Sequence, residues 1–311
     1  MKDLLRIADL SPDDLAHILY LSDLVHDDPH QYADLLRGDM VVTYFAEPST
    51  RTRLSFVSAI AHLGGVPQVV GPDELQLGRG ETIEDTARVV SRYARAFVIR
   101  TFADDDVRRF ADAASIPVVN ALTDGHHPCQ ALADLFTLRR HFGDLKGLRL
   151  AYLGDGNNVA HSLLEACALA GVDIVVATPP GFEPSPDVVE AAEGLAKVSG
   201  SVVWTTHDPL VGVAGADAVY TDVWLSMGDP EDERVARHAA LAPYQVNAAL
   251  MAEASANAVF MHCLPAHRGE EVSADVMDGT RSVVLDEAEN RMHTAQALLV
   301  ALLRGELMGA G

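Results

Sequence analysis

Cysteine, lysine and long apolar runs are all scarce in this sequence of 311 residues. The three cysteines, Cys129, Cys167 and Cys263, are odd and sparse in number, so we expect free thiols in a reducing compartment rather than a disulfide framework. No apolar run approaches the roughly 20 residues that a membrane-spanning helix needs. The opening stretch MKDLLRIADLSPDDL is too acidic for a signal peptide, and these absences together predict a cytoplasmic protein without a membrane segment.

Positive charge is also scarce, because 23 lysines and arginines face 45 acidic residues and the formal net charge is -22. Such a surface repels nucleic acid and anionic lipid, so neither is expected as a partner. Two origins of this balance stay open: a lysine-poor, alanine-rich composition set by genome bias, or an acidic surface adapted to high salt. In either case, arginines that gather near hydroxyl groups stand out against a negative background.

Apolar segments of strand length alternate with segments of helical periodicity along the whole chain. Strands are predicted at 40–45, 67–70, 96–100 and 117–120, and again after a turn-rich GDLKG junction at 148–153, 173–177, 201–205, 218–221 and 259–262. The helices predicted between and after them include 131–142, 245–254 and 287–303.

This alternation predicts parallel sheets that are covered by helices on both faces. We therefore expect an α/β protein of two doubly wound domains, 1–133 and 134–291, with a cleft between them. A C-terminal helix within 292–311 should pack back on the first domain. Ligands should bind where the strands end, because the carboxyl ends of parallel strands share one edge of a sheet.

The stretch EPSTRTR follows the first strand and opens a helix, and it brings Ser49, Thr50, Arg51, Thr52 and Arg53 together. A helix N-terminus presents backbone N–H groups and the positive end of the helix dipole, which favours an anion. The hydroxyl and guanidinium groups go beyond what capping requires, so we expect a phosphate-sized anion. The alternative is an ordinary capped helix with surface arginines. The spaced glycines and the lysine of a P-loop are absent.

A second cluster, DGHHPCQ, lies between a strand end and a helix, where His127 and Gln130 could point toward one ligand. The alternative for His127 is a purely structural role. Adjacent His126 and His127 raise the question of zinc, but the spacing of Cys, His and acidic residues matches no metal pattern. We therefore expect no metal at this cluster.

Arg100 ends another strand, where a buried guanidinium requires an anionic partner.

The glycine-rich turn GDGNNVAHS raises the question of a dinucleotide site. Asn158 and His161 stand where the third glycine of that fingerprint is needed, and the next strand ends at Thr178 and Pro179 without an acidic residue for a ribose. We therefore expect no nicotinamide cofactor. Two asparagines at a helix start suit recognition of the polar head of an amino acid.

Two further motifs, DVWLSMG and HCLPAHRGEE, each follow an apolar strand. Asp222 of the first motif suits an ammonium group. The Leu264–Pro265 bond favours a cis peptide, which would turn a backbone carbonyl toward a ligand. Cys263 has two competing interpretations, a small buried hydrophobe and the nucleophile of a Cys–His–Asp hydrolase, although no oxyanion turn surrounds it.

Taken together, STRTR, HPCQ, GDGNNVAHS, DVWLSMG, HCLP and ENR resemble the aspartate/ornithine carbamoyltransferase family over essentially the whole chain, in the family's order and at compatible spacings. The SMG and HCLP motifs are similar to the ornithine branch. The lysine-bearing loop and the HPLPR-like segment of the aspartate branch are replaced here by QLGRGET and HCLPAHR. One departure is FAEPSTRTR, where ornithine enzymes commonly read FEKxSTRTR. It concerns a supporting contact beside the anion loop and leaves the anion ligands in place.

The resemblance implies transfer of the carbamoyl group of carbamoyl phosphate to the δ-amine of L-ornithine, which yields L-citrulline and phosphate. The catalytic residues that it implies are Arg100, His127, Cys263 and Thr52. The carbamoyl phosphate ligands that it implies are Ser49, Thr50, Arg51, Thr52, Gln76, Arg100, His127, Gln130, the Leu264 carbonyl and Arg291. The ornithine ligands that it implies are Asn158, Asp222, Ser226, Met227 and Cys263.

The implied chemistry is attack of a neutral amine on a carbonyl, so neither a metal nor an organic cofactor is expected. The resemblance also implies a homotrimer or a multiple of trimers, in which the Gln76 loop reaches a neighbouring subunit's site. Putrescine and N-acetylornithine remain alternative acceptors. A non-catalytic binding module is a further alternative, but it would have no need for Arg100, His127 and Cys263 together. Anabolic and catabolic directions both stay open.

Overall fold

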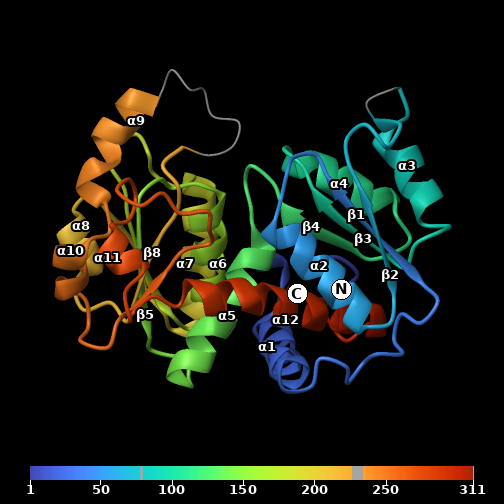
Figure 1. Ribbon diagram of the computed structural model, residues 1–311, viewed down its shortest axis with the longest axis horizontal. Helices are drawn as coiled ribbons and strands as arrows, with labels where there is room; N and C mark the ends of the chain where they lie inside the picture. The colour runs from blue at the N-terminus through green and yellow to red at the C-terminus, as the bar shows by residue number, and fades with distance from the viewer. Residues whose placement is uncertain (78–79, 226–233, 311) are drawn as a thin grey trace. The chain divides into compact units, whose positions relative to one another are not determined.

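The computed structural model describes residues 1–77, 80–225 and 234–310, and it divides into two compact units (Figure 1). Unit 1 comprises Met1–Phe136 and Glu289–Gly311, and unit 2 comprises Thr137–Ala288. Helices α5 (Pro128–Phe142) and α12 (Val284–Arg304) each cross from one unit into the other. The domain limits expected from the sequence, after residues 133 and 291, lie inside these same two helices.

Unit 1 is built on a four-stranded sheet of order β2-β1-β3-β4 in which every pair is parallel. Its strands are β1 (Met40–Phe45), β2 (Val66–Val70), β3 (Ala96–Arg100) and β4 (Val118–Leu122). The chain adds β2 on one side of β1 and then β3 on the other, so the winding reverses between β1 and β3. Their last residues, Phe45 and Arg100, are paired in register. The loops after these two strands therefore flank the place where open α/β sheets bind ligands.

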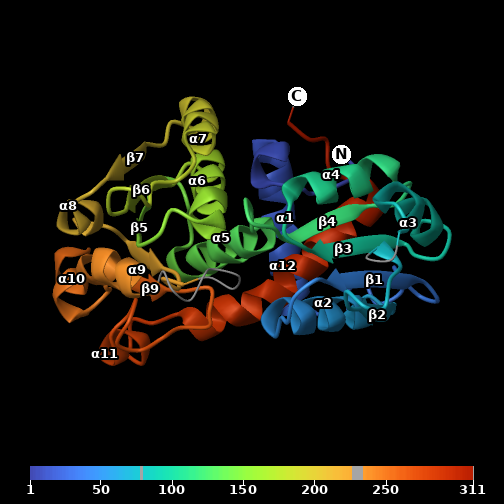
Figure 2. The same ribbon diagram turned by 90° about the horizontal axis from the view of Figure 1, so that it is seen from above.

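Helices cover both faces of this sheet, as the strand composition requires. The strands MVVTYF and AFVIR are almost entirely buried, which is typical of parallel strands packed on two sides. The helices of unit 1 are α1 (Pro12–Asp27), α2 (Arg51–His62), α3 (Ile83–Val90) and α4 (Asp104–Ala113), with the crossing helices α5 and α12. Figure 2 shows α4 and α2 on opposite sides of the sheet. On the α4 side, the rings of Phe97 and Phe110 stack with their centroids 4.0 Å apart.

Unit 2 contains a five-stranded parallel sheet of order β7-β6-β5-β8-β9. Its strands are β5 (Arg149–Leu153), β6 (Asp173–Ala177), β7 (Val203–Thr206), β8 (Ala218–Thr221) and β9 (Val259–Met261). Its helices are α6 (Asn158–Ala170), α7 (Pro186–Ser199), α8 (Pro209–Val213), α9 (Arg234–Leu241), α10 (Ala248–Glu253) and α11 (Ala274–Met277). Figure 1 shows α6 and α7 on one side of the strands and α8 and α10 on the other. The winding reverses between β5 and β8, so this unit repeats the arrangement of the first.

The predicted α/β class with doubly wound parallel sheets is confirmed, and most predicted strands coincide with observed strands within a few residues. The helix predicted at 245–254 is wrong in its first turn, because Asn247 caps α10 by accepting the N–H groups of Ala249 and Leu250. The 3-10 turn Ala242–Tyr244 precedes it. Helices α1, α9 and α11 were not predicted. Among the described residues, no helix combines the length and apolar character needed to cross a membrane.

Replacing the buried ring of Phe97 tests the core on the α4 side. Phe97→Ala should lower the free energy of unfolding by about 3–5 kcal/mol, because it leaves a cavity and removes the stacked partner of Phe110. Tyr93→Ala, at a ring that is 72% exposed, should change it by less than about 0.5 kcal/mol. Urea unfolding followed by circular dichroism measures both. Equal losses in the two variants would contradict the assignment of Phe97 to the core.

Candidate active site

The turn between β1 and α2 carries the hydroxyl and arginine cluster of unit 1. Thr50 occupies the N-cap of α2, yet within the described structure its side chain forms no capping hydrogen bond. Arg51 and Thr52 form the first turn of the helix, where the dipole is positive. Arg100, at the end of β3, donates to the Ser49 hydroxyl at 3.4 Å. The hydroxyl of Thr50 is therefore not used as an ordinary cap, and the two strand ends place Arg100 beside this turn.

A buried guanidinium joins three helices of unit 1. Arg291 of α12 is only 3% exposed, and it donates to the Thr52 hydroxyl at 3.0 Å and to the side-chain oxygen of Gln130. The Gln130 amide donates in turn to the buried Asp134 carboxylate at 2.8 Å. A buried charge of this kind needs such partners because its desolvation is costly. The structure thus brings together Thr52, Gln130 and Arg291, which the sequence assigned to one ligand, and adds Asp134, which the sequence did not single out.

His127 lies immediately before α5, which opens with Pro128, a residue well suited to the first helical position. The imidazole is 5% exposed. Burial, and then the charges of Arg291, Arg100 and Arg51, hold the pKa of His127 well below its usual 6.5. The ring is therefore neutral near pH 7, where it can donate one hydrogen bond without carrying a charge.

The loop that carries His127 is fixed by residues that the sequence did not identify. Thr123 donates to Asp104 at 2.6 Å, and His126 Nδ1 lies 3.0 Å from the same carboxylate oxygen. Although burial acts to raise the pKa of Asp104, the hydrogen bonds from His126 and Thr123 lower it. His126 is thus held by an acid at the start of α4. The nearby Cys129 is buried, and burial raises the pKa of its thiol to about 12, so it acts as an apolar group.

Two other residues of unit 1 bear on the predicted site. Gln76 is exposed beyond β2, and its backbone carbonyl accepts the Glu81 N–H at 3.3 Å. No contact between its side chain and the Arg291 cluster is among the described interactions. Burial raises the pKa of Asp124, and the negative charges of Asp104 and Glu47 raise it further. Glu47 lies in the segment that departs from the expected motif. The glutamate at position 47 therefore adds negative charge that acts on Asp124.

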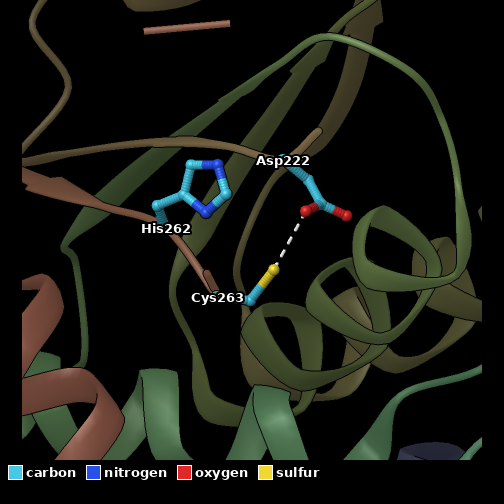
Figure 3. A group of neighbouring side chains, drawn as sticks. All are labelled: Asp222, His262 and Cys263. Atoms are coloured by element: carbon cyan, nitrogen blue, oxygen red, sulfur yellow. Dashed lines mark hydrogen bonds between the residues drawn. The ribbon is translucent and has the colours of Figure 1, made fainter. Parts of the chain in front are cut away.

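Unit 2 holds an anchored carboxylate at the end of β8. Asp222 is 6% exposed, and it accepts the Val223 N–H at 2.8 Å, the Asn157 amide at 2.8 Å and the Cys263 thiol at 3.0 Å. Figure 3 shows the Cys263 sulfur directed at this carboxylate. A carboxylate has about four lone-pair positions, so Asp222 retains capacity for a further donor such as an ammonium group.

Asn157, the neighbour of the predicted ornithine ligand Asn158, supports this carboxylate. The Asn157 side-chain oxygen caps α6 by accepting the N–H groups of Val159 and Ala160, which turns its NH₂ group toward Asp222. Asn158 is the first residue of the helix and is partly buried. The signal that could have found Asn157 is the strong preference for asparagine at an N-cap directly before an apolar helix.

His262 is fully buried and is part of a separate hydrogen-bond chain. Its Nδ1 accepts the Leu264 N–H at 2.8 Å, so the proton belongs on Nε2, which lies 3.3 Å from Glu271. Burial acts to raise the pKa of Glu271, but hydrogen bonds from His262 and the His267 N–H lower it. A second acid, Glu287, accepts the backbone N–H of His262 at 2.9 Å. Neither Glu271 nor Glu287 was assigned a role from the sequence.

This arrangement argues against one interpretation of Cys263, the nucleophile of a hydrolase, and also shows whether the cluster around it suits a metal ion. A Cys–His–Asp hydrolase needs a histidine nitrogen that accepts the thiol proton, but both ring nitrogens of His262 are engaged and the thiol donates to Asp222. The donor atoms of Asp222, His262 and Cys263 lie within 4.8 Å of one another. Because His262 uses its lone pair on the Leu264 N–H, this cluster does not fit a metal ion, which requires that lone pair.

The remaining predicted residues are Leu264, Ser226 and Met227. The Leu264–Pro265 peptide bond is cis, as predicted, and Leu264 adopts a left-handed backbone with φ of 58°. Ser226 and Met227 lie outside the described residues, so their assignment stays a prediction.

The lowered pKa of His127 has a measurable consequence for stability. Between its native pKa and 6.5, the unfolded chain binds a proton that the native chain does not, so stability falls as the pH drops through this window. His127→Gln removes this contribution. Between about pH 7 and pH 5, the free energy of unfolding should fall less in the variant than in the wild type. The difference between the two proteins should be at most about 1.4 kcal/mol per pH unit. Urea unfolding at a series of pH values measures the difference, and parallel curves would show that His127 does not stay neutral.

Comparison with known proteins finds matches that cover both units of the chain. Residues 2–140 match the carbamoyl-P binding domain of aspartate/ornithine carbamoyltransferase, and residues 146–302 match the Asp/Orn binding domain of the same family. An ornithine carbamoyltransferase of Parafrankia sp. (strain EAN1pec) is 56% identical over 276 residues, which cover 89% of this chain and 87% of the relative. That of Bacillus subtilis (strain 168) is 48% identical over 306 residues, which cover 98% and 95%.

Solved structures agree as well. The ornithine carbamoyltransferase from Pyrococcus furiosus superposes with a TM-score of 0.93 at 46% identity, covering 99% of this chain and 98% of that one. The enzyme from Thermus thermophilus gives a TM-score of 0.87 at 40% identity, covering 97% and 99%. The ordered motifs, the two parallel sheets and these matches across both units lead to one conclusion: the chain belongs to the aspartate/ornithine carbamoyltransferase family.

Proposed function

We propose that this protein transfers the carbamoyl group from carbamoyl phosphate to the δ-amine of L-ornithine, producing L-citrulline and phosphate. The observation that carries the proposal is the group in unit 1, where Arg291 contacts Thr52 and Gln130, Arg100 contacts Ser49, and burial and the charges of nearby arginines keep His127 neutral. Such a group can hold a phosphate and polarise a carbonyl at the same time. The relatives matched over nearly the whole chain are named ornithine carbamoyltransferases, which supports ornithine as the acceptor.

Carbamoyl phosphate is assigned to the β1–α2 turn and its neighbours. The phosphate group would accept from the backbone and side chains of Ser49, Thr50, Arg51 and Thr52, since guanidinium groups and helix N-termini both favour phosphate oxygens. Arg100 would reach the phosphate and the carbonyl oxygen. The carbamoyl amide is assigned to Gln130, Arg291 and the Leu264 carbonyl.

The proposed reaction uses the neutrality of His127. The unprotonated δ-amine attacks the carbonyl carbon and a tetrahedral oxyanion forms. As the oxyanion collapses, the bond between the carbonyl carbon and the phosphate oxygen breaks, and the phosphate leaves into the site that already holds it. The departing phosphate takes up the proton that the amine nitrogen loses, which leaves a neutral ureido group. Thr52, Arg100 and His127 would donate to the oxyanion, and preorganised donors of this kind are worth roughly 3–4 kcal/mol each. Because His127 is uncharged, it donates a hydrogen bond without repelling the neighbouring arginines. These side chains suffice for the chemistry, so the proposal includes no cofactor or metal.

Ornithine is assigned to unit 2 by matching each of its charged groups to a residue that could bind it. Asp222 would bind the α-ammonium group, and Asn158 would donate to the α-carboxylate, together with Ser226 and the Met227 backbone. Cys263, which contacts Asp222 at 3.0 Å, would lie near the δ-amine. Putrescine lacks a carboxylate and would leave the donors unpaired, at roughly 1–3 kcal/mol for each buried one. Aspartate would bring a second carboxylate, and the described contacts of Asp222 include no cation to meet it.

A substrate panel tests this assignment. Steady-state kinetics of ureido-product formation with ornithine, putrescine, aspartate, lysine and N-acetylornithine should give the highest kcat/KM for ornithine. Asp222→Ala should raise the KM for ornithine much more than the KM for carbamoyl phosphate, and Arg51→Ala should do the reverse. A higher kcat/KM with any other amine would replace the proposed acceptor, and no product with any of them would favour a binding module.

We extend the proposal to the setting in which the enzyme works. The family resemblance supports a homotrimer or a multiple of trimers with shared active sites, and the exposure of Gln76 in the single chain is consistent with a role in a neighbouring subunit. All three cysteines are free thiols, which supports a cytoplasmic location. Carbamoyl transfer to ornithine supports a role in arginine metabolism.

Subunit mixing tests the shared site. Gln76→Ala and Arg51→Ala homomers should each be nearly inactive, because each lacks one ligand of carbamoyl phosphate in every site. Mixed oligomers made by subunit exchange should recover part of the wild-type kcat, since some sites then receive both native residues. Exchange is verified by native mass spectrometry of differently tagged chains. Verified exchange without recovered activity would show that each chain builds its own site.

A further inference from the structure

One arginine of unit 2, Arg237 in α9, contacts the loops that follow three different strands. Its Nε donates to the Trp224 carbonyl at 2.8 Å, in the loop after β8. Its terminal nitrogen forms an ion pair with Asp155, in the loop after β5. The guanidinium carbon lies 5.1 Å from the centroid of the Phe182 ring, in the loop after β6. The side chain is only 15% exposed, so these contacts are largely shielded from water.

Two of these loops leave the sheet where its winding reverses. Strands β5 and β8 are neighbours, with Leu153 paired to Thr221 near their carboxyl ends. Asp155 and Trp224 follow these two residues closely in the sequence. Arg237 therefore connects the two loops that border the switch point of unit 2, where open α/β sheets bind ligands.

The same two loops are joined a second time by the hydrogen bond that supports Asp222. The Asp155 carbonyl accepts the Asn157 N–H at 2.8 Å and the Tyr152 hydroxyl at 2.8 Å. The Asn157 amide then donates to Asp222 at 2.8 Å. On the other side, Trp224 follows Asp222 by two residues. Arg237 thus fixes both chain segments whose separation determines where the Asp222 carboxylate lies.

We propose that Arg237 is a positioning residue for the ammonium-binding carboxylate Asp222, acting through the Asp155 turn and the Trp224 carbonyl. This inference rests on the proposed function, which assigns the ornithine α-ammonium group to Asp222. Arg237 also balances the charge of Asp155, which is 18% exposed and lies in the same loop as Asn157. Without the guanidinium, the Asp155 carboxylate would turn toward water and carry Asn157 with it. A lysine has one compact charge and does not match the three directions that a guanidinium serves.

A merely structural role for Arg237 would be to attach α9. However, α9 has other attachments: Arg234 donates to Glu270 at 3.0 Å, and His238 Nε2 lies 3.3 Å from the same carboxylate. The His238 ring also packs edge-on against Trp224, with centroids 5.3 Å apart. Removing Arg237 should therefore loosen the Asp155 turn while α9 stays in place. Arg234→Met is a matched control, because it removes an arginine of the same helix whose described ion pair is with Glu270.

The experiment compares steady-state kinetics of the full-length wild type, Arg237→Met, Arg237→Lys and Arg234→Met. Arg237→Met should raise the KM for ornithine by about tenfold to a hundredfold, the effect of one lost charge-assisted hydrogen bond, with the KM for carbamoyl phosphate within about twofold. Arg237→Lys should recover part of the loss, and Arg234→Met should stay within about twofold of the wild type. Thermal unfolding of each variant verifies that the fold persists.

Two further measurements separate positioning from direct contact with the substrate. Asp155→Asn should raise the KM for ornithine, as Arg237→Met does. Adding Arg237→Met to Asp155→Asn should have little further effect, because both changes break the same ion pair. The preference for ornithine over its α-carboxamide should stay unchanged in Arg237→Met. A collapse of that preference would show that Arg237 binds the α-carboxylate instead.

Other outcomes would also overturn the inference. An unchanged KM for ornithine in Arg237→Met, or an equal increase in Arg234→Met, would show that Arg237 only attaches α9. Failure of the proposed function would look different, because the wild type itself would then form no citrulline from ornithine.

Discussion

Every strand within each unit runs parallel to its neighbours, and the placement of the functional side chains depends on this constraint. Parallel strands have their carboxyl ends at one edge of the sheet, and they are connected by crossovers that pack helices on both faces. When the winding reverses, the loops of two adjacent strands diverge and leave room for a ligand. The reversals at β1/β3 and β5/β8 explain why Arg100 lies beside the Ser49 hydroxyl and why Asn157 reaches Asp222.

The two units use charge in opposite ways on a chain of net charge -22. Unit 1 concentrates arginines, and the buried guanidinium of Arg291 is connected to the Asp134 carboxylate through the Gln130 amide. Burial, together with the same positive environment, lowers the pKa of His127 and keeps the ring neutral. Unit 2 concentrates its site on a carboxylate that neutral donors hold in place. Under the proposed function, an anionic substrate and an ammonium-bearing substrate would thereby each be met by a group of opposite charge.

Much of the fold could be predicted from the sequence, because buried parallel strands are short apolar runs and their helices have a different period. Boundaries were predicted less well where a cap decides them, as at Asn247, whose side chain rather than an apolar pattern sets the start of α10. For the site, the charged and hydroxyl residues of EPSTRTR and the cis bond at Pro265 were found because their local chemistry is unusual. Asp104 and Glu287 were missed, because each contacts a residue far away in the sequence. Glu271 was missed although it lies in the same motif as His262, because only the fold of that loop brings the two side chains together.

The sequence by itself determined the residue types at the two sites, the parallel α/β class and the family, because these follow from local composition and from the order of short motifs. Only the tertiary structure decided which side chain forms which hydrogen bond. Asn157 caps α6 with its side-chain oxygen and thereby donates its NH₂ group to Asp222, and His262 is committed to Leu264 and Glu271 rather than to Cys263. The physical reason is that a hydrogen bond depends on direction as well as proximity, and direction is set by caps, turns and partners that only the folded chain brings together.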